Sequence, residues 1–431
     1  MEKKVLIITY YWPPSGGSGV QRWLKFVKYL PGFGWEPYVF TPENPSFAIQ
    51  DESLSKDVAA DAEIVRFPIW EPYEAFFKLS SVFDEKKSAK PAELVSGNEK
   101  SLFQKVSTWI RGNFFIPDPR IFWVKPSVKF LNDFLQENKI KTIITTGPPH
   151  SLHLIGYNLK RKNPSIKWLA DFRDPWSEWG LLDSLMVGSI ARNIHRKLEA
   201  KVLKCADKVI TITPFYVRRF ERLSGRKVAL LTNGYDDDDF KNLVIQSTHK
   251  FVIRHVGMVN ERCDPRPFMQ AVQQLAIENA SFRSLVQVDF VGDVNPQFKA
   301  FVQSLSAISL LTTFTTPVQH SELIAMYGSS SLLLIVLTGY KDAEGYMPGK
   351  LFEYLATGLP IVGTGPENGD ASNLLKEIGV GGMIDGSEVE KIKRNVLDHF
   401  EAWKNGSVSV SKKAGIKYSR KEITRALTEL L

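Results

Sequence analysis

The sequence predicts an α/β protein built from two doubly wound, Rossmann-like domains. Three observations support this fold class. The 431 residues exceed what one hydrophobic core usually organises, so two domains are expected. Short apolar runs typical of buried parallel strands alternate with amphipathic helical patterns. This alternation runs through the first half of the chain and starts again near residue 251.

The first series begins with a continuous apolar strand at residues 4–9, a glycine-rich turn and a helix at 21–30. This order is typical of a β-α-β unit. Further strands are predicted at 37–40, 63–67, 142–146, 167–171, 208–213 and 227–232, with helices at 151–162 and 188–205. Residues 85–100 are polar and charged, which indicates an exposed excursion.

The second series predicts strands at 251–256, 285–291, 310–314, 332–336 and 359–362, and helices at 267–279, 321–327 and 349–357. The polar stretch 236–250 is the expected linker. We therefore place the first domain at 1–244 and the second at 245–431. The last helix, within about 409–431, is expected to pack back on the first domain.

Composition excludes several classes of protein. Two distant cysteines, Cys205 and Cys263, cannot form a disulfide scaffold, which favours a reducing compartment. The apolar run at residues 5–8 is too short for a secretory signal, and residues 332–337 are too short to span a bilayer. We expect a cytoplasmic protein. Its net charge of +8 suits an anionic partner.

A glycine loop, with Gly16, Gly17 and Gly19, follows the first strand and opens the first helix. Backbone N–H groups at such a helix start can bind a phosphate or a sugar. A tight strand-to-helix turn explains the glycines equally simply. The spacing is not G-x-G-x-x-G, and no acidic residue closes the second strand. This disfavours a dinucleotide-dependent oxidoreductase.

A second candidate site is the segment 349–360. Pro348 and Gly349 begin a helix, and Lys350 and Glu353 share one face of it. A cation at a helix N-terminus is favourable when a phosphate lies there. A carboxylate one turn later can accept hydrogen bonds from a ribose. The alternative is an ordinary surface Lys–Glu pair, worth about 0.3 kcal/mol.

Several segments together resemble the family 4 retaining glycosyltransferases of bacterial surface-polysaccharide synthesis, which have the GT-B fold of two Rossmann-like domains facing across a cleft. The donor-binding segment 350–360 carries the resemblance most specifically. The other matching segments, in chain order, are 16–19, 145–151, 171–176, 233–236, 255–257 and 291–292.

The resemblance implies a nucleoside-diphosphate sugar, UDP- or GDP-linked, as co-substrate, and neither a cofactor nor a metal. It implies catalytic roles for His150 and Asp174 and an acceptor contact for Arg173. The residues it implies for the donor are Gly16, Gly17, Gly19, Asn233, Gly257, Arg262, Val318, Gly349, Lys350, Leu351 and Glu353.

The sequence departs from the family at one position. Many members have a glutamate eight residues before the ribose-binding one, where this chain has Gly345. Glu344 is displaced by one residue, so its role is not transferred. Backbone N–H groups at residues 346–349 are the alternative contact for the donor sugar.

Several of these residues also have a purely structural explanation. His150 could be a loop histidine that caps the next helix, and Arg173 could pair with Asp171 or Asp174. The four aspartates at 236–239 are read as a solvated loop rather than a metal site. His255 is read as a satisfied core residue. No histidine or cysteine spacing suits zinc.

Positive charge collects with aromatic residues in the first domain. Residues 192–227 contain eleven Lys and Arg against three acidic residues, and residues 103–134 mix aromatic with basic side chains. This combination suits an anionic membrane surface or a lipid-linked phosphate. Ordinary amphipathic helices with solvated lysines are the alternative. Nucleic acid is not expected, because no groove-reading motif is present.

The function expected from these features is retaining sugar transfer from a nucleotide sugar to a hydroxyl acceptor, lipid-linked or saccharide. The setting would be cell-surface polysaccharide or glycolipid synthesis, with the protein cytoplasmic or peripheral on the inner face of the membrane. Two alternatives are a GT-B sugar-nucleotide epimerase and a non-catalytic accessory protein that binds nucleotide sugars.

Overall fold

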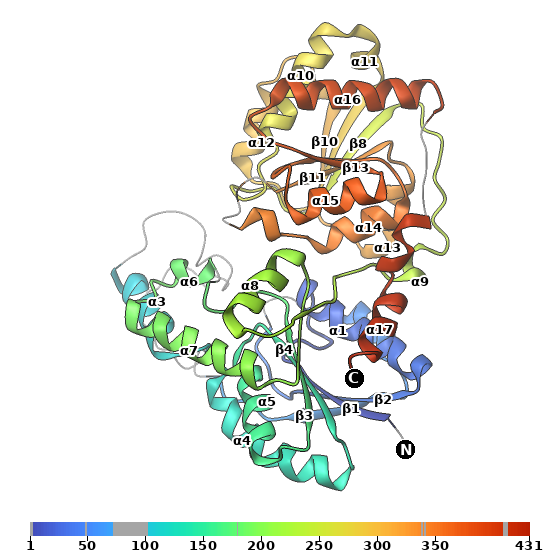
Figure 1. Ribbon diagram of the computed structural model, residues 1–431. Coiled ribbons are helices and arrows are strands. Elements are labelled where there is room, and N and C mark those ends of the chain that lie inside the picture. Colours follow the sequence, from blue (N-terminus) through green and yellow to red (C-terminus); the bar gives the residue numbers. More distant parts are fainter. Residues whose placement is uncertain are drawn as a thin grey trace. The chain divides into compact units, whose positions relative to one another are not determined.

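The computed structural model describes residues 3–47, 50–71, 102–178, 180–337, 339, 342–407 and 413–431. The chain divides into two compact units (Figure 1). The first comprises Met1–Thr232 together with Thr424–Leu431, and the second comprises Asn233–Ile423. The units therefore meet at residue 233, whereas the sequence placed the boundary after residue 244. The excursion expected at 85–100 lies outside the described residues.

The first unit contains a seven-stranded parallel sheet with the order β3-β2-β1-β4-β5-β6-β7. Its strands are β1 (Lys3–Ile8), β2 (Trp35–Pro42), β3 (Glu63–Phe67), β4 (Thr142–Gly147), β5 (Lys167–Phe172), β6 (Lys208–Thr211) and β7 (Ala229–Leu230). The strand order reverses between β1 and β4. Ligands of doubly wound folds bind at the carboxyl ends of the strands flanking such a point.

Helices and short 3-10 turns connect these strands. They are α1 (Ser18–Tyr29), η1 (Leu30–Phe33), η2 (Glu52–Asp57), α3 (Leu102–Phe114), α4 (Ile121–Glu137), α5 (Ser151–Lys162), α6 (Leu181–Ser184), α7 (Ser189–Cys205) and α8 (Pro214–Ser224). One core cluster joins a face of the sheet to α4, α5, α7 and α8. Its largest buried members are Phe40, Trp123, Trp168 and Phe172.

The second unit contains a six-stranded parallel sheet with the order β10-β9-β8-β11-β12-β13. Its strands are β8 (Phe251–Val256), β9 (Val286–Val291), β10 (Thr312–Thr315), β11 (Leu332–Val336), β12 (Ile361–Thr364) and β13 (Gly381–Ile384). Its helical elements are α9 (Asp237–Phe240), α10 (Arg266–Glu278), α11 (Ala280–Leu285), α12 (Pro296–Gln303), η4 (Ser309–Leu311), α13 (His320–Gly328), η5 (Ala343–Gly345), α14 (Gly349–Thr357), α15 (Asp370–Ile378), α16 (Val389–Lys404) and η6 (Lys413–Tyr418).

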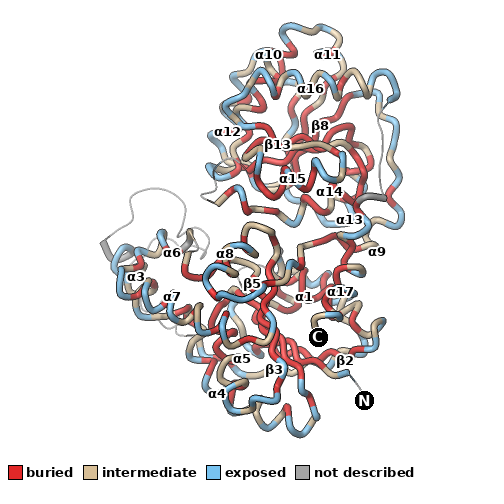
Figure 2. Tube along the Cα trace, viewed as in Figure 1, coloured by how far each residue is buried: buried red, intermediate tan, exposed pale blue. Residues whose placement is uncertain are grey.

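Helices cover both faces of the second sheet, as the continuous apolar strands predict. On β11, Leu332 and Leu334 belong to the cluster with α10, α12 and α16, while Leu333 and Ile335 belong to the cluster with α13, α14 and α15. Figure 2 shows this sheet as a buried layer between half-exposed helices. With two such sheets, the molecule has the two Rossmann-like domains of the GT-B fold.

The last helix, α17 (Arg420–Thr428), begins in the second unit and ends in the first. Lys167 on β5 donates a hydrogen bond to the carbonyl oxygen of Leu431. The sequence predicted that the C-terminal helix returns to the first domain, and the last eight residues are grouped there.

Each predicted strand matches an observed one to within a few residues, but β13 was not predicted, and further errors concern helices and one linker. Helices α3, α4, α8, α12, α15 and α16 are among those not predicted, and α4 carries Pro126 within its length. The acidic run is not a solvated loop: Asp236 is buried and caps the short helix α9 by accepting a hydrogen bond from the backbone N–H of Asp238. Aspartate favours this cap position because its carboxylate satisfies an unpaired N–H.

A buried carboxylate organises the carboxyl edge of the first sheet. Asp171 is fully buried and accepts hydrogen bonds from three side chains. The Nε1 of Trp23 lies 2.7 Å from it, and the Oγ1 of Thr146 lies 3.1 Å from it. The third donor is Arg22, whose Nε and Nη2 each lie 3.2 Å from one carboxylate oxygen.

Arg22 also binds the chain where it leaves the first unit. Its Nη2 donates to the carbonyl oxygen of Leu231 and its Nη1 donates to that of Thr232, both at 2.8 Å. The Arg22–Asp171 pair thus joins α1, β4, β5 and the exit of the chain.

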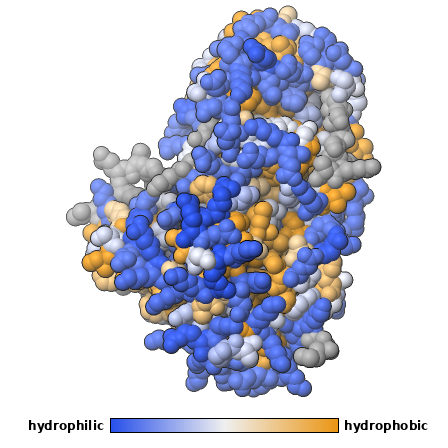
Figure 3. Space-filling view, in the orientation of Figure 1, coloured by the Kyte–Doolittle hydropathy of each residue, from blue (hydrophilic) through white to orange (hydrophobic). Residues whose placement is uncertain are grey.

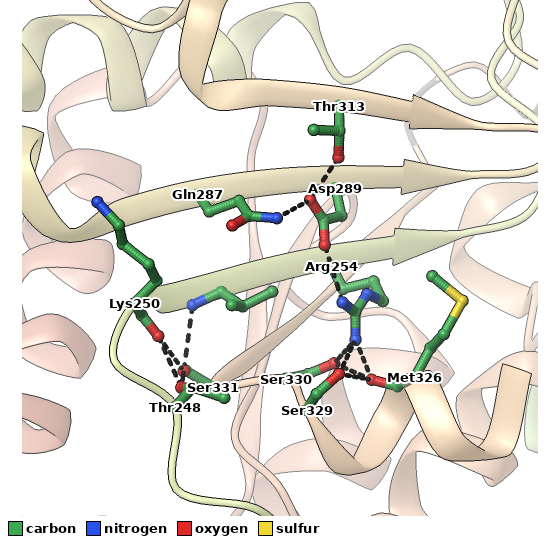
Figure 4. A network of polar contacts seen from close by, with 11 residues as sticks. Thr248, Lys250, Arg254, Gln287, Asp289, Thr313, Met326, Ser329, Ser330 and Ser331 are labelled. Atoms are coloured by element: carbon green, nitrogen blue, oxygen red, sulfur yellow. Dashed lines mark hydrogen bonds and ion pairs between the residues drawn. The ribbon is translucent and has the colours of Figure 1, made fainter.

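A second buried ion pair lies within the sheet of the second unit (Figure 4). Arg254 on β8 donates to the Asp289 carboxylate on β9 at 2.8 Å. Its other guanidinium nitrogen donates to Ser330 Oγ at 2.7 Å and to the Met326 carbonyl oxygen. The cation therefore lies at the C-terminus of α13, where the helix dipole favours positive charge.

We expect Asp171→Asn to lower the free energy of unfolding by about 3–5 kcal/mol, because it leaves the Arg22 guanidinium buried without its counter-charge. Denaturant unfolding of the full chain measures this loss. The matched control is Asp183→Asn, which breaks a half-exposed pair with Arg192 and should cost no more than about 1 kcal/mol. Equal losses in the two variants would contradict the role given to Asp171.

Candidate functional site

Two glycines stand at the carboxyl edge of the second sheet. Gly257 follows β8 with φ +119°, and Gly292 follows β9 with φ +134°. A Cβ on Gly292 would lie 2.5 Å from the carbonyl oxygen of Gly257. Both positions require glycine, because the backbone conformation is strained for other residues and the two loops touch.

Lys350, in the first turn of α14, lies against this glycine pair. Its Nζ donates to the carbonyl oxygen of Val256 at 2.8 Å, and a Cβ on Gly257 would lie only 2.8 Å from the same Nζ. Burial lowers the pKa of Lys350 to about 8, although Cys263 and Glu353 act in the opposite direction. An anion at the start of α14 would relieve this cost, because both the ammonium and the helix N-terminus attract it.

Tyr354 fixes the helix to the strand. Its hydroxyl accepts a hydrogen bond from the backbone N–H of Val256 at 2.9 Å. The next residue in the first turn, Leu351, is fully buried in the same core. The buried side chains of Leu351 and Tyr354 therefore fix the orientation of α14, and with it the direction of Lys350.

Glu353 lies one turn after Gly349 and has two partners on α13. Tyr327 donates its hydroxyl to Oε2 at 2.8 Å, and His320 Nε2 lies 3.3 Å from Oε1. Burial alone would raise the pKa of Glu353, but His320 and Tyr327 together hold it below its usual value. The side chain is 26% exposed, so an ionised carboxylate is held ready at the surface.

The other predicted donor residues of the second unit are spread more widely. Val318 is half-buried against the core beneath α13 and α14. Arg262 is exposed, and its described hydrogen bonds come from its backbone. Asn233 begins the unit beside Gly234, whose Cα lies against the carbonyl oxygen of Tyr418. The structure thus brings Gly257, Gly349, Lys350, Leu351 and Glu353 together, and Arg262 directly precedes Cys263, which interacts electrostatically with Lys350.

A pocket of about 850 Å³ lies at the carboxyl ends of β12 and β13. Its charged lining consists of Glu344, Glu367, Asp385, Glu388 and Lys391. Four carboxylates against one ammonium disfavour a phosphate there. Glu344 faces this acidic pocket.

In the first unit, Arg173 links the two loops at the switch point of the sheet. Its guanidinium donates to the carbonyl oxygens of Gly19 at 2.8 Å, Pro148 at 2.6 Å and Gly147 at 3.3 Å. The expected alternative of a pair with Asp171 is wrong, because Asp171 binds Arg22. Arg173 therefore orients the start of α1 and the end of β4.

His150 is buried just after β4. Its ring is parallel to that of Trp176, with 5.1 Å between centroids, and lies 5.9 Å from the His153 ring. Burial, aided by His153 and Arg173, lowers the pKa of His150 well below its ordinary value, so the imidazole is neutral at pH 7. It does not cap α5; the Asp118 carboxylate accepts from the Ser151 N–H at 2.8 Å instead.

Asp174 follows Arg173 at the end of β5. Burial raises the pKa of Asp174, while Arg173 lowers it. The glycines of the first loop are close to these residues in the fold: Gly17 precedes α1 with φ +84°, and the Cα of Gly19 packs on the Tyr11 ring. Gly16 is half-buried in the same loop. His150, Arg173, Asp174 and the glycine loop thus share one edge of the first sheet.

Other sequence interpretations can be compared with the structure. His255 is a core residue, as predicted: it is fully buried, and its Nδ1 lies 3.0 Å from the carbonyl oxygen of Leu334. The prediction that its polar atoms are satisfied holds for Nδ1 alone, because the buried Nε2 has no hydrogen-bond partner in the described part of the chain. Cys205 and Cys263 are both free thiols. Among the described residues, no group of three or more His, Cys, Asp or Glu is arranged to hold a metal ion.

The sequence did not identify the partners of Glu353. His320 is one of the histidines whose spacing does not suit zinc, and Tyr327 ends the helix predicted at 321–327. Strand β11 separates both residues from Glu353 along the chain. The contact therefore depends on how α13 packs beside α14. The available signal was a tyrosine at the end of a mostly apolar helix, because a buried hydroxyl usually needs a hydrogen-bond partner.

No family model and no curated protein matches the chain. Several solved structures do match the chain. A glycosyltransferase from Rickettsia africae matches with TM-score 0.62 and 13% identity, over 100% of this chain and 97% of the other. Anabaena HepE, solved in complex with UDP-glucose, matches with TM-score 0.58 and 13% identity, over 99% and 98% of the two chains.

A third match is a Listeria monocytogenes protein provisionally named a UDP-N-acetylglucosamine 2-epimerase, with TM-score 0.54 and 11% identity, over 99% of this chain and 95% of the other. The matches extend over whole chains and show that this protein has the GT-B fold. Among the described residues, no helix is both long and apolar enough to cross a membrane.

We expect Gly292→Ala to destabilise the chain by roughly 1–3 kcal/mol, because the new methyl group meets a backbone carbonyl at a strained φ. Chemical denaturation followed by circular dichroism measures the change. Gly32→Ala is the control, since nothing lies within 4 Å of its added Cβ. Full tolerance of alanine at position 292 would contradict the close approach of the two loops.

Proposed function

We propose that the protein is a retaining glycosyltransferase that moves a sugar from a UDP- or GDP-linked donor to a hydroxyl acceptor. The observation that carries this proposal is the arrangement on α14. A desolvated ammonium lies at the start of the helix beside a glycine loop, and an ionised carboxylate lies one turn later. This spacing suits a diphosphate and a ribose.

In this proposal the second unit holds the donor. Lys350 and the N-terminus of α14 stabilise the negative charge that grows on the diphosphate as the sugar departs, and Arg262 adds to it from the exposed loop. Glu353 accepts hydrogen bonds from the ribose hydroxyls. The backbone near Gly349 and the neighbouring residue Val318 complete the donor contacts that the family resemblance implies.

The first unit supplies the acceptor side. His150 is neutral and shares the carboxyl edge of the first sheet with Asp174, so these two residues orient the acceptor or the donor sugar without adding positive charge. Arg173 positions the loop that carries them. The leaving phosphate can itself take the acceptor proton, so the mechanism needs no protein nucleophile and no metal. Hexosyl or N-acetylhexosaminyl transfer fits this scheme.

The setting we propose is cell-surface polysaccharide or glycolipid synthesis in the cytoplasm, with a lipid-linked or saccharide acceptor. The resemblance of segments 145–151 and 171–176 to bacterial enzymes of this kind supports it. An epimerase is the second candidate, because one of the matching structures carries that name. An accessory protein that binds donor without turnover is the third.

The deciding experiment is incubation with a panel of UDP- and GDP-sugars, with and without lipid-linked or saccharide acceptors. Transfer that requires an acceptor and keeps the anomeric configuration supports our proposal. Conversion of the nucleotide sugar without any acceptor would establish the epimerase instead. Donor binding without turnover on any acceptor would favour the accessory protein.

We expect Glu353→Ala to abolish thermal stabilisation by the nucleotide that protects the wild-type chain. At a concentration of 100 times Kd the wild type gains about 2.7 kcal/mol from the ligand, which a melting curve detects readily. Glu322→Ala on α13 is the control, because Glu322 is exposed. An unchanged nucleotide shift in Glu353→Ala would refute the ribose assignment.

Donor affinity should fall as the pH rises through the pKa of Lys350, which is about 8. The protonated fraction drops from about nine-tenths at pH 7 to about one-tenth at pH 9, so Kd should rise by up to about tenfold. Calorimetric titration with UDP and GDP measures this. Lys350→Arg keeps its charge at both pH values and should bind with little pH dependence; a wild type that shows none would contradict the assignment.

A further inference from the structure

An exposed apolar surface lies where α3 meets the start of α7. Trp109 is 46% exposed, Phe114 69%, Met186 40% and Ile190 80%. The rings of Trp109 and Phe114 touch edge to face, with 5.7 Å between their centroids. In Figure 3, hydrophobic residues show at the edge of the molecule where Figure 1 places α3. This surface is a candidate for contact with another molecule.

Specific hydrogen bonds and a close backbone contact hold this surface in place. The amide of Asn113 donates to the carbonyl oxygens of Trp109 at 2.8 Å and Met186 at 3.1 Å, and its oxygen accepts from the N–H of Gly188 at 2.8 Å. Gly112 allows the close approach, since a Cβ there would lie 2.4 Å from the carbonyl oxygen of Leu185. These contacts hold the two elements together while their largest apolar side chains face outward.

The exposed side of α7 passes from apolar to basic along its length. Ile190 and Ile194 lie one turn apart at its start. Lys197, Lys201 and Lys204 are exposed and follow Ile190 at helical spacing, so they share its side of the helix. An apolar group with lysines beside it is typical of helices that lie in a lipid interface.

Net charge is divided unequally between the two units. The first unit has 36 Lys and Arg against 25 Asp and Glu, a net charge of +11, whereas the second has 19 against 22, a net charge of −3. The whole positive excess therefore belongs to the unit that carries the apolar surface. A second copy of the chain would bring two strongly positive units together, which disfavours a dimer through this surface.

We propose that the surface formed by Trp109, Phe114, Met186 and Ile190 docks on an anionic membrane. The aromatic and aliphatic side chains enter the boundary between headgroups and acyl chains, and the lysines of α7 bind anionic headgroups. Tryptophan suits this boundary because its ring is apolar and its N–H stays hydrated. The proposal concerns surface binding and does not depend on which reaction the protein catalyses.

Flotation of the full chain with vesicles tests this proposal. Vesicles of phosphatidylcholine containing about 30% phosphatidylglycerol should bind the protein, and pure phosphatidylcholine should bind it weakly, because the attraction to anionic headgroups is lost. The triple variant Trp109→Ser, Phe114→Ser, Ile190→Ser should reduce binding about tenfold or more. Lys197→Glu with Lys201→Glu should also weaken it, and high salt should do the same.

The matched control replaces exposed apolar residues of the second unit, Ile277→Ser with Leu310→Ser, which are 64% and 97% exposed. This variant should bind vesicles like the wild type. Melting curves of each variant verify that it is folded. Glu353→Gln should also keep vesicle binding, which separates this proposal from the proposed sugar transfer.

Several results would overturn the proposal. One is equal binding to neutral and anionic vesicles, and another is full binding by the folded triple variant. A third is the absence of vesicle binding together with dimers that the triple variant disrupts. Tight binding of single-stranded nucleic acid, lost in the triple variant, with no vesicle binding would assign the surface to another class of partner.

Discussion

The first unit depends on one buried carboxylate, Asp171, and on the arginine that neutralises it. A charge with no access to water is tolerated only when it is paired and hydrogen-bonded. Arg22, Trp23 and Thr146 meet this need, and they belong to α1 and β4, so the helix after the glycine loop is tied to the strands beside it. Arg22 then holds the chain at Thr232, where the first unit ends. The positions of the glycine loop, of Arg173 and of the unit boundary follow from this pair.

In the second unit the buried charges are paired within the sheet, and the carboxyl edge of the sheet carries a different group of residues. Arg254 and Asp289 neutralise each other between β8 and β9. Beyond the end of β8, Gly257 admits the ammonium of Lys350, and Tyr354 holds the helix that carries it. Desolvation of the ammonium lowers its pKa although Glu353 acts in the opposite direction, which is unfavourable for stability and suitable for an anionic ligand. In the proposed function, such a site loses little energy to reorganisation when charge develops on the donor diphosphate.

The contrast between the two units extends to their surfaces. The first unit carries the excess of positive charge and an outward-facing aromatic group at α3, whereas the second is mildly acidic and contains an acidic pocket beside β12 and β13. This division supports a separation of tasks, with donor chemistry in one unit and contact with an anionic surface in the other. In the two proposals, the charged side chains of α14 serve the first task, and the lysines of α7 serve the second.

The sequence by itself determined the fold class and most strands, because buried parallel strands are continuous apolar runs and the positions of glycine and proline mark their ends. It also named Gly257, Lys350 and Glu353 as candidate site residues from short segments with fixed spacing, and the structure places these three residues near one another. Among the elements it missed are β13, α15 and α16 near the end of the chain, and α3 and α4, where aromatic residues and Pro126 obscure the helical period. Only the tertiary structure decided that Arg173 binds backbone carbonyls, that Asp118 caps α5 and that His320 and Tyr327 hold Glu353. Such contacts join residues that are distant along the chain, and their geometry depends on helix packing that no local pattern records.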